Sequence, residues 1–246
     1  MSKRVLIKYG EKEHLEKIEE GKIRFAPSQV YVKMEEDLHN TGQGDLLEGK
    51  FVFHAEGLKL TRTDTGETIT LSGKQRLSFN APDINNMPVF CISEYREEYF
   101  TDDDKLCIPQ DKINSIKKDF PNASYALIVL DADDFINSVR CAGGHTIQSD
   151  SIHYFDYEMN DLRMMSFLST GNEDISLSGG KATLSVSYEN RYRILLCKDK
   201  DFSNQDEYRF VVQDELSDCP IFYDFNYSGK YLLLPIDDLL NSVSLS

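Results

Sequence analysis

The most apolar stretch of the chain constrains its fold most strongly. Residues 125–130 read YALIVL and contain no charged side chain. A strand that is apolar at every position, instead of at alternate positions, is typical of a strand buried on both faces of a sheet. We therefore expect residues 125–130 to form a central strand.

Short strands and short helices alternate on either side of this run. The chain opens with a strand at 4–9, a helix at 11–20 that ends at Gly21, and a second strand at 23–26. Further strands are expected at 89–93, 152–155, 183–188, 191–197, 208–213 and 230–234, and further helices at 28–34, 109–119, 133–139 and 161–168, with a helical turn at 235–240. The pattern predicts an α+β fold with a mixed, mainly antiparallel sheet and short helices.

Residues 40–80 differ from the rest because glycines separate short alternating runs. The runs at 51–54, 58–62 and 67–71 predict a β-meander, with a hairpin turn at Asp64-Thr65-Gly66. The spacing leaves open whether this meander is an insertion or an extension of the main sheet. Since we find no internal repeat and no clean linker, we expect one α+β domain over 1–246, with a possible β-meander insertion at 40–80.

The acidic charge balance restricts the partners of the protein. The formal net charge is −15, which opposes nonspecific binding to nucleic acid and to anionic membranes. No run reaches the ~20 apolar residues of a membrane helix. The five cysteines form no C-x-x-C pair and the start of the chain has no apolar signal stretch, which favours reduced, buried thiols in the cytoplasm. The histidines lack the close spacing of a zinc site, so no metal is expected.

One motif near the C-terminus carries candidate chemistry. Residues 198–210 contain Lys198, Phe202, Gln205, Glu207 and then Tyr208-Arg209-Phe210. On a strand, Glu207 and Arg209 lie on one face, and Gln205 joins them if the strand begins early enough. A fixed carboxylate can stabilise the oxocarbenium-like cation that forms when a glycosidic bond breaks, and the residue two positions before it can orient the incoming nucleophile.

This motif resembles the closing motif of a broad group of bacterial and phage proteins of unknown activity. In that group a Lys is followed by an aromatic residue and then by Gln/Glu-x-Glu-aromatic-Arg. The opening residues 8–10 and 21–25 and the later residues 90–93 also fit the group, and the matching pieces cover about a quarter of the chain.

More distantly, the chain resembles the ADP-ribosyltransferase fold, and the resemblance implies an NAD site. A basic residue on the first strand, a Ser-x-Ser on a middle strand and a late glutamate are the parts of that site. The resemblance assigns Glu207 and Gln205 as catalytic, and Lys8, Tyr9, Ser185, Ser187 and Arg209 as NAD-binding. The chain departs from the pattern in having Lys8 where Arg or His is usual, and in the short interval from Ser187 to Glu207.

Other interpretations of these residues stay open. The alternative hypothesis is a non-enzymatic module of phage or bacterial defence or counter-defence that binds a nucleotide or a protein. Glu207 and Arg209 also fit a purely structural ion pair. Asp131-Ala132-Asp133, at the end of the apolar strand, has the form of a phosphoryl-transfer motif, although Asp133 is also explained as a helix N-cap. A transferase needs Glu207 accessible in a cleft near Lys8, whereas a binding module needs a basic, aromatic-lined pocket and tolerates a paired Glu207.

Overall fold

The centre of the protein is an eight-stranded antiparallel sheet. The computed structural model describes residues 3–38, 47–80, 83–103, 105–169, 175–178, 181–184, 187–240 and 243–244. Six strands follow in the order β14 (Ile221–Asp224), β2 (Lys22–Pro27), β5 (Pro88–Tyr95), β1 (Val5–Gly10), β7 (Tyr125–Val129) and β15 (Tyr231–Pro235); β13 (Glu207–Val212) joins β5, and β8 (Ile147–Ser151) joins β13. The predicted α+β class is confirmed.

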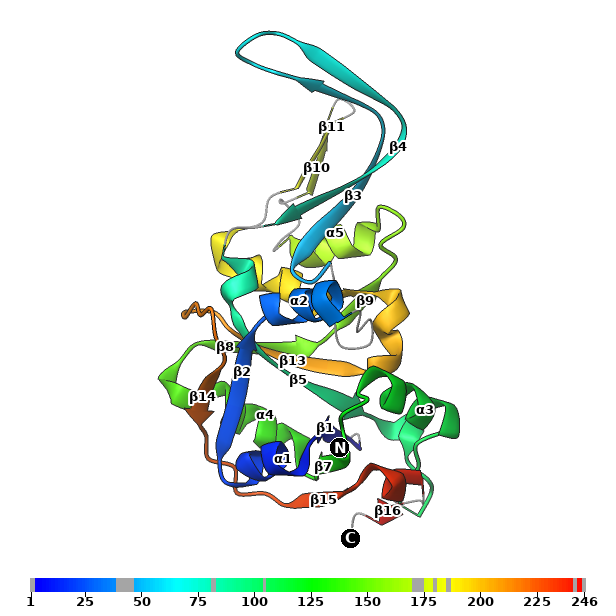
Figure 1. The fold of residues 1–246 in the computed structure, drawn as a ribbon, viewed down its shortest axis with the longest axis vertical. Coiled ribbons are helices and arrows are strands. Elements are labelled where there is room, and N and C mark those ends of the chain that lie inside the picture. The colour runs from blue at the N-terminus through cyan, green and yellow to red at the C-terminus, as the bar shows by residue number, and fades with distance from the viewer. Residues whose placement is uncertain are drawn as a thin grey trace.

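Strand β7 occupies the interior position that its apolar sequence predicts. It pairs with β1 on one edge and with β15 on the other. Leu127 and Val129 pack on one face with α1 (Lys12–Glu19) and α4 (Ala132–Arg140). Ala126 and Ile128 pack on the opposite face with α3 (Gln110–Asp119) and the 3-10 helix η6 (Ile236–Leu240). Helices therefore cover both faces of the sheet (Figure 1).

Strand β5 is the branch point of the sheet. Ser93 pairs with Glu207 on β13 and also with Ile7 on β1, so β13 and β1 lie on opposite edges of β5. Val89 pairs with Val211 on β13 and with Ala26 on β2, so β2 shares the edge that β1 uses. Between these contacts, Phe90–Ile92 have no strand partner on that edge among the described residues. The first two strands of the chain therefore diverge from β5 and leave an opening between them.

Residues 40–80 do not form the predicted three-stranded meander in their described part, 47–80. One long hairpin is present instead, made of β3 (Lys50–Thr61) and β4 (Thr68–Asn80). The first two predicted runs are continuous because Gly57, at positive φ, makes a register shift and not a turn. The turn at Gly66 is present as predicted. In Figure 1 this hairpin projects from the sheet as a long arm.

The remaining elements are short. They are α2 (Gln29–Leu38), α5 (Leu162–Leu168), β6 (Lys105–Leu106), β9 (His153–Phe155), β10 (Ile175–Ser178), β11 (Lys181–Leu184), β12 (Cys197–Asp199), β16 (Val243–Ser244) and the 3-10 helices η1 (Ile84–Asn86), η2 (Glu97–Tyr99), η3 (Ala142–Gly144), η4 (Tyr188–Leu196) and η5 (Lys200–Gln205). The parallel pairing of β12 with β9 lies outside the main sheet.

Two local predictions are wrong. The strand expected at 191–197 is mostly the 3-10 helix η4, since Ile194 packs in one apolar cluster while Leu195 and Leu196 pack in another. The N-cap of α4 is Asp131 and not Asp133, because the Asp131 carboxylate accepts the backbone N–H of Asp134 at 3.0 Å. This cap gives Asp131 a structural role and leaves the phosphoryl-transfer interpretation without support.

The cysteines are all free thiols, but the prediction that they are buried is wrong for most of them. Cys197 is buried and Cys91 is half-buried, whereas Cys107, Cys141 and Cys219 are exposed. None of the helices in the described ranges is long and apolar enough to cross a membrane.

Candidate active or binding cleft

A cavity of about 520 Å³ lies at the opening between β1 and β2. Its walls come from β1, α1, β2, α2, β5, the segment after α3, and β13. The floor is the unpaired edge of β5, around Phe90, Cys91 and Ile92. The divergence of two strands from one neighbour therefore creates the space, and residues from both ends of the chain meet in it.

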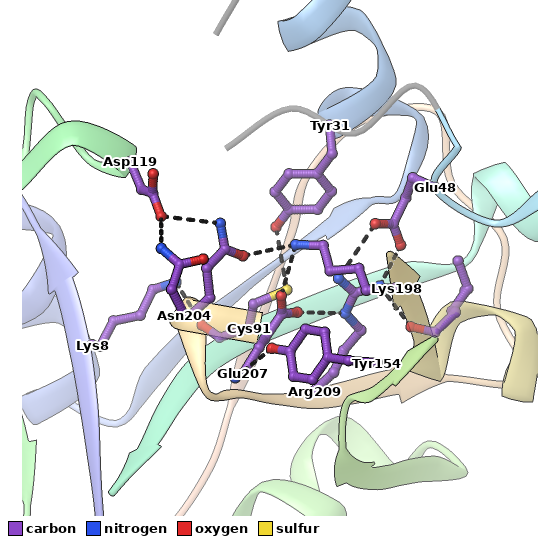
Figure 2. A network of polar contacts seen from close by, with 12 residues as sticks. Lys8, Tyr31, Glu48, Cys91, Asp119, Tyr154, Lys198, Asn204, Glu207 and Arg209 are labelled. Atoms are coloured by element: carbon purple, nitrogen blue, oxygen red, sulfur yellow. Dashed lines mark hydrogen bonds and ion pairs between the residues drawn. The ribbon is translucent and has the colours of Figure 1, made fainter. Parts of the chain in front are cut away.

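Glu207, at the start of β13, lies in the wall of this cavity but is only 7% exposed. Its Oε1 accepts a hydrogen bond from Arg209 Nε at 2.6 Å, and its Oε2 accepts one from Lys198 Nζ at 3.0 Å (Figure 2). Its backbone N–H donates to the Tyr154 hydroxyl at 3.0 Å. Burial alone would raise the pKa of Glu207, but the attraction of Arg209 and Lys198 outweighs burial and holds that pKa well below its ordinary value. Glu207 is therefore ionised and bound through both oxygens.

Arg209 anchors this network to the interior. Its guanidinium is 1% exposed and forms a second ion pair with Glu48, with Nη2 3.4 Å from Glu48 Oε2. Nη1 also donates to the Leu195 carbonyl at 2.6 Å. The guanidinium thus donates to three protein groups: Glu207, Glu48 and the Leu195 carbonyl. Arg209 is therefore a structural member of the site, with fewer N–H groups left to bind a ligand.

Gln205 and Glu207 meet, but not through strand periodicity. Gln205 ends the 3-10 helix η5, and β13 begins only at Glu207. Asp206 between them has a left-handed backbone with φ of 44°. Both flanking side chains nevertheless bind the same ammonium group, since Lys198 Nζ donates to Gln205 Oε1 at 2.8 Å. Lys198 therefore organises the pair.

Asp206 is held in this unusual conformation by its own side chain. Its Oδ2 accepts hydrogen bonds from Lys112 Nζ at 2.6 Å and from the Tyr99 hydroxyl at 2.7 Å. A non-glycine residue at positive φ is strained and persists only where surrounding contacts determine it. These two contacts, one from η2 and one from α3, fix the chain direction immediately before Glu207.

Lys8 lies in the same cavity, on the opposite wall. Its Nζ donates to the carbonyl of Cys91 at 2.6 Å and lies 5.1 Å from the centre of the Phe90 ring. Burial lowers the pKa of Lys8. The nearby Cys91 thiol has its pKa raised to about 12, by burial first and then by the charge of Glu207, so this thiol is neutral and not a nucleophile at neutral pH.

The other predicted site residues do not all lie in the cavity. Tyr9 contributes to the cavity wall, but it is 6% exposed and its hydroxyl is engaged with that of Tyr95 at 2.6 Å. Ser187 is exposed at the start of η4, accepts a hydrogen bond from Asn190, and is not among the residues that line the cavity. Ser185 lies outside the described residues. The structure thus brings Lys8, Gln205, Glu207 and Arg209 together, and leaves Ser187 apart.

The sequence interpretation missed several members of the site. Lys198 stood in the motif without a role, and Tyr31 reaches the cavity from α2, with its hydroxyl 3.8 Å from Cys91 Sγ. The exposed cations at the mouth, Lys17, Lys22 and Arg24, were also missed. The alternation of Lys22 and Arg24 around buried Ile23 was the available signal for a basic strand face.

The protein is thus an acidic α+β protein whose cleft, at a branch point of the sheet, is lined by more cationic than anionic side chains. The chain matches no family model, no curated protein and no solved structure at a significant level. Within the described ranges, no group of three or more His, Cys, Asp or Glu side chains is placed to hold a metal ion.

Proposed function

We propose that the cleft between β1 and β2 binds an anionic nucleotide. The charge of its lining carries this proposal. Six Lys and Arg residues but two Glu residues line the cavity in the described part of the chain, although the whole protein has a net charge of −15. A local excess of cations on an acidic protein needs a specific reason, and phosphate groups are the common partners of such a cluster.

Aromatic groups in the same cleft fit the base of a nucleotide. Phe222, on β14, is 50% exposed and carries Lys17 Nζ 5.5 Å from its ring centre. Tyr31 and Phe120 are half-buried in the wall. Exposed aromatic rings beside cations provide a stacking surface next to phosphate-binding groups. The cleft therefore has the two kinds of surface that a nucleotide requires.

The state of Glu207 favours binding over catalysis. Both of its oxygens accept hydrogen bonds from buried cations, so its charge is already compensated inside the protein. Transition-state stabilisation of a ribosyl cation depends on negative charge that is directed at the substrate. We therefore place Glu207 as the group that holds Lys198 and Arg209 in the cleft wall.

Calorimetric titration of the purified protein with AMP, ADP and NAD tests this proposal. The wild type should bind at least one of them, and Arg24→Gln should weaken that binding about tenfold, the value of one charge-assisted hydrogen bond. Lys59→Gln, which removes an exposed lysine on the arm, is the matched control and should leave the affinity unchanged. Absence of binding at millimolar nucleotide, or an equal effect of both substitutions, would contradict the proposal.

A second candidate is NAD-dependent ADP-ribosyl transfer, favoured by one observation. Glu207 and Gln205 share Lys198 in a cavity wall, so a carboxylate held ionised lies where a ribose could enter. Cleavage would break the bond between ribose and nicotinamide, leave the electron pair on nicotinamide, and transfer the ADP-ribosyl group to an acceptor hydroxyl, amine or water. The acceptor would release its proton to solvent. Release of nicotinamide by the wild type, and its loss in a folded Glu207→Gln variant, would support this candidate. Binding of NAD without turnover would exclude it.

A further inference from the structure

The cations of the cleft lie at two levels of exposure, and this arrangement restricts the ligand further. Lys17, Lys22 and Arg24 are exposed at the mouth, on α1 and β2, whereas Lys8 is half-buried on β1. We propose that the inner end of the cleft binds a second anionic group, so that the ligand is a nucleotide with negative charge at both ends, such as a nucleoside bisphosphate. This inference rests on the nucleotide-binding proposal and names its ligand class.

Lys8 differs from the other two inner cations in lacking a carboxylate partner. Lys198 and Arg209 each form an ion pair with Glu207. No carboxylate in the described part of the chain lies within ion-pair distance of Lys8, and Glu207 attracts it only from farther away. The Lys8 ammonium donates to the Cys91 carbonyl and lies near the Phe90 ring. Buried charges in proteins are normally paired. An anionic group of the ligand would complete this pairing.

The surroundings of Lys8 strengthen the attraction to an anion. Ile7, Leu15 and Ile18, which share the cavity wall with it, are each at most 5% exposed and apolar. An ion pair formed against such a wall is screened less by water than one at the mouth.

The mouth supplies a separate set of contacts. No hydrogen bond or ion pair to another described residue holds the side chains of Lys22 and Arg24, so both are available to a ligand. Arg24 lies opposite Phe222 in the pairing of β2 with β14, next to the exposed ring. A first phosphate at this mouth and a second at Lys8 would place the nucleoside between them, along the walls formed by Tyr31 and Phe120.

A comparison of two ligands that differ by one phosphate tests the inner site. Calorimetry gives the affinities of AMP and of adenosine 3′,5′-bisphosphate, and their ratio is the gain from the second phosphate. The wild type should show a gain of about tenfold or more. Lys8→Met should reduce the gain to near one, and Lys8→Arg should retain most of it. Arg24→Met, the matched control at the mouth, should weaken both ligands by the same factor and leave the gain intact.

Each outcome decides the inference. A wild type that binds AMP without any gain from the second phosphate, or a gain that survives in Lys8→Met, overturns it while the nucleotide proposal stands. Failure of the wild type to bind either ligand overturns both proposals. Methionine has a similar shape to lysine and removes a half-buried charge, so folding should persist, as thermal unfolding would show. If Lys8→Met does not fold, Lys8→Gln provides the same comparison.

Discussion

At the residue scale, Arg209 connects the cleft to the interior of the protein. It joins Glu207 on its own strand to Glu48, which lies 161 positions earlier in the chain. Such a buried network contributes little net stability as a whole, because desolvation of the charges offsets their attraction. Removal of one member lowers the free energy of unfolding strongly, since the remaining charges stay buried without their partner.

Arg209→Met should lower the free energy of unfolding by about 3–5 kcal/mol. The control Arg62→Met removes one member of an exposed pair with Asp64, and should change it by at most about 0.5 kcal/mol. Urea unfolding measures both. Addition of Glu48→Gln to Arg209→Met should recover part of the loss, because it removes one stranded charge. A loss for Arg209→Met as small as that for Arg62→Met would show that the network is dispensable for folding.

At the scale of elements, the position of β14 beside β2 depends on close packing by η3. Gly143 has φ of 61°, and a Cβ atom there would lie 2.7 Å from Cδ1 of Tyr223 on β14. Tyr223 in turn packs edge-on against Phe25 of β2, with ring centres 5.2 Å apart. This contact therefore helps to hold the strand pair that presents Arg24 and Phe222 to the cleft.

Gly143→Ala should destabilise the protein more than Gly144→Ala does. Both glycines have positive φ, but a Cβ atom at Gly144 meets nothing within 4 Å. Each alanine carries the left-handed strain of about 1–2 kcal/mol, and only Gly143→Ala adds the overpacking cost of about 1–3 kcal/mol. Thermal unfolding of the two variants isolates the contact with Tyr223. Equal losses in both would mean that Tyr223 moves aside without cost.

At the scale of the whole molecule, the arm and the sheet differ in how they are covered. The sheet has helices on both faces, whereas the distal arm, the part of the β3–β4 hairpin at residues 58–71, is a two-stranded ribbon. Leu58 pairs with Leu71 and Leu60 with Ile69 on one face of the arm, and Leu60 and Ile69 are 50% and 54% exposed. A lone two-stranded hairpin is at best marginally stable in water. The arm should therefore open independently of the sheet.

Hydrogen exchange followed by mass spectrometry tests this difference. Peptides from the distal arm should exchange at least about a hundredfold faster than peptides from β7 and β5, because local opening of the arm exposes little buried surface. Peptides from β13 provide a second slow reference, since all six of its residues are buried. Protection of the distal arm as strong as that of β7 would mean that another surface covers the leucines.

Local sequence patterns determined the elements that depend on near neighbours. The apolar run at 125–130 predicted an interior strand, and the residues around Gly66 predicted a hairpin turn, because side-chain periodicity and turn chemistry act within a few residues. The motif at 198–210 located Glu207, Gln205 and Arg209 as residues of interest, and the resemblance to the ADP-ribosyltransferase fold added Lys8. The local patterns misjudged Gly57 and the 191–197 segment, where register and packing against distant residues decide the conformation.

Only the tertiary structure decided how those residues meet. The opening that makes the cleft exists because β1 and β2 leave the same edge of β5, a pairing that no local pattern encodes. The partnership of Arg209 with Glu48 joins segments that lie 161 positions apart in the chain. The sequence thus determined which residues carry charge and placed Glu207 close to Arg209 and Lys198 in the chain, because those three residues lie within ten or so positions of one another. Long-range packing determined that Arg209 also reaches Glu48 and that Lys8 faces the cavity.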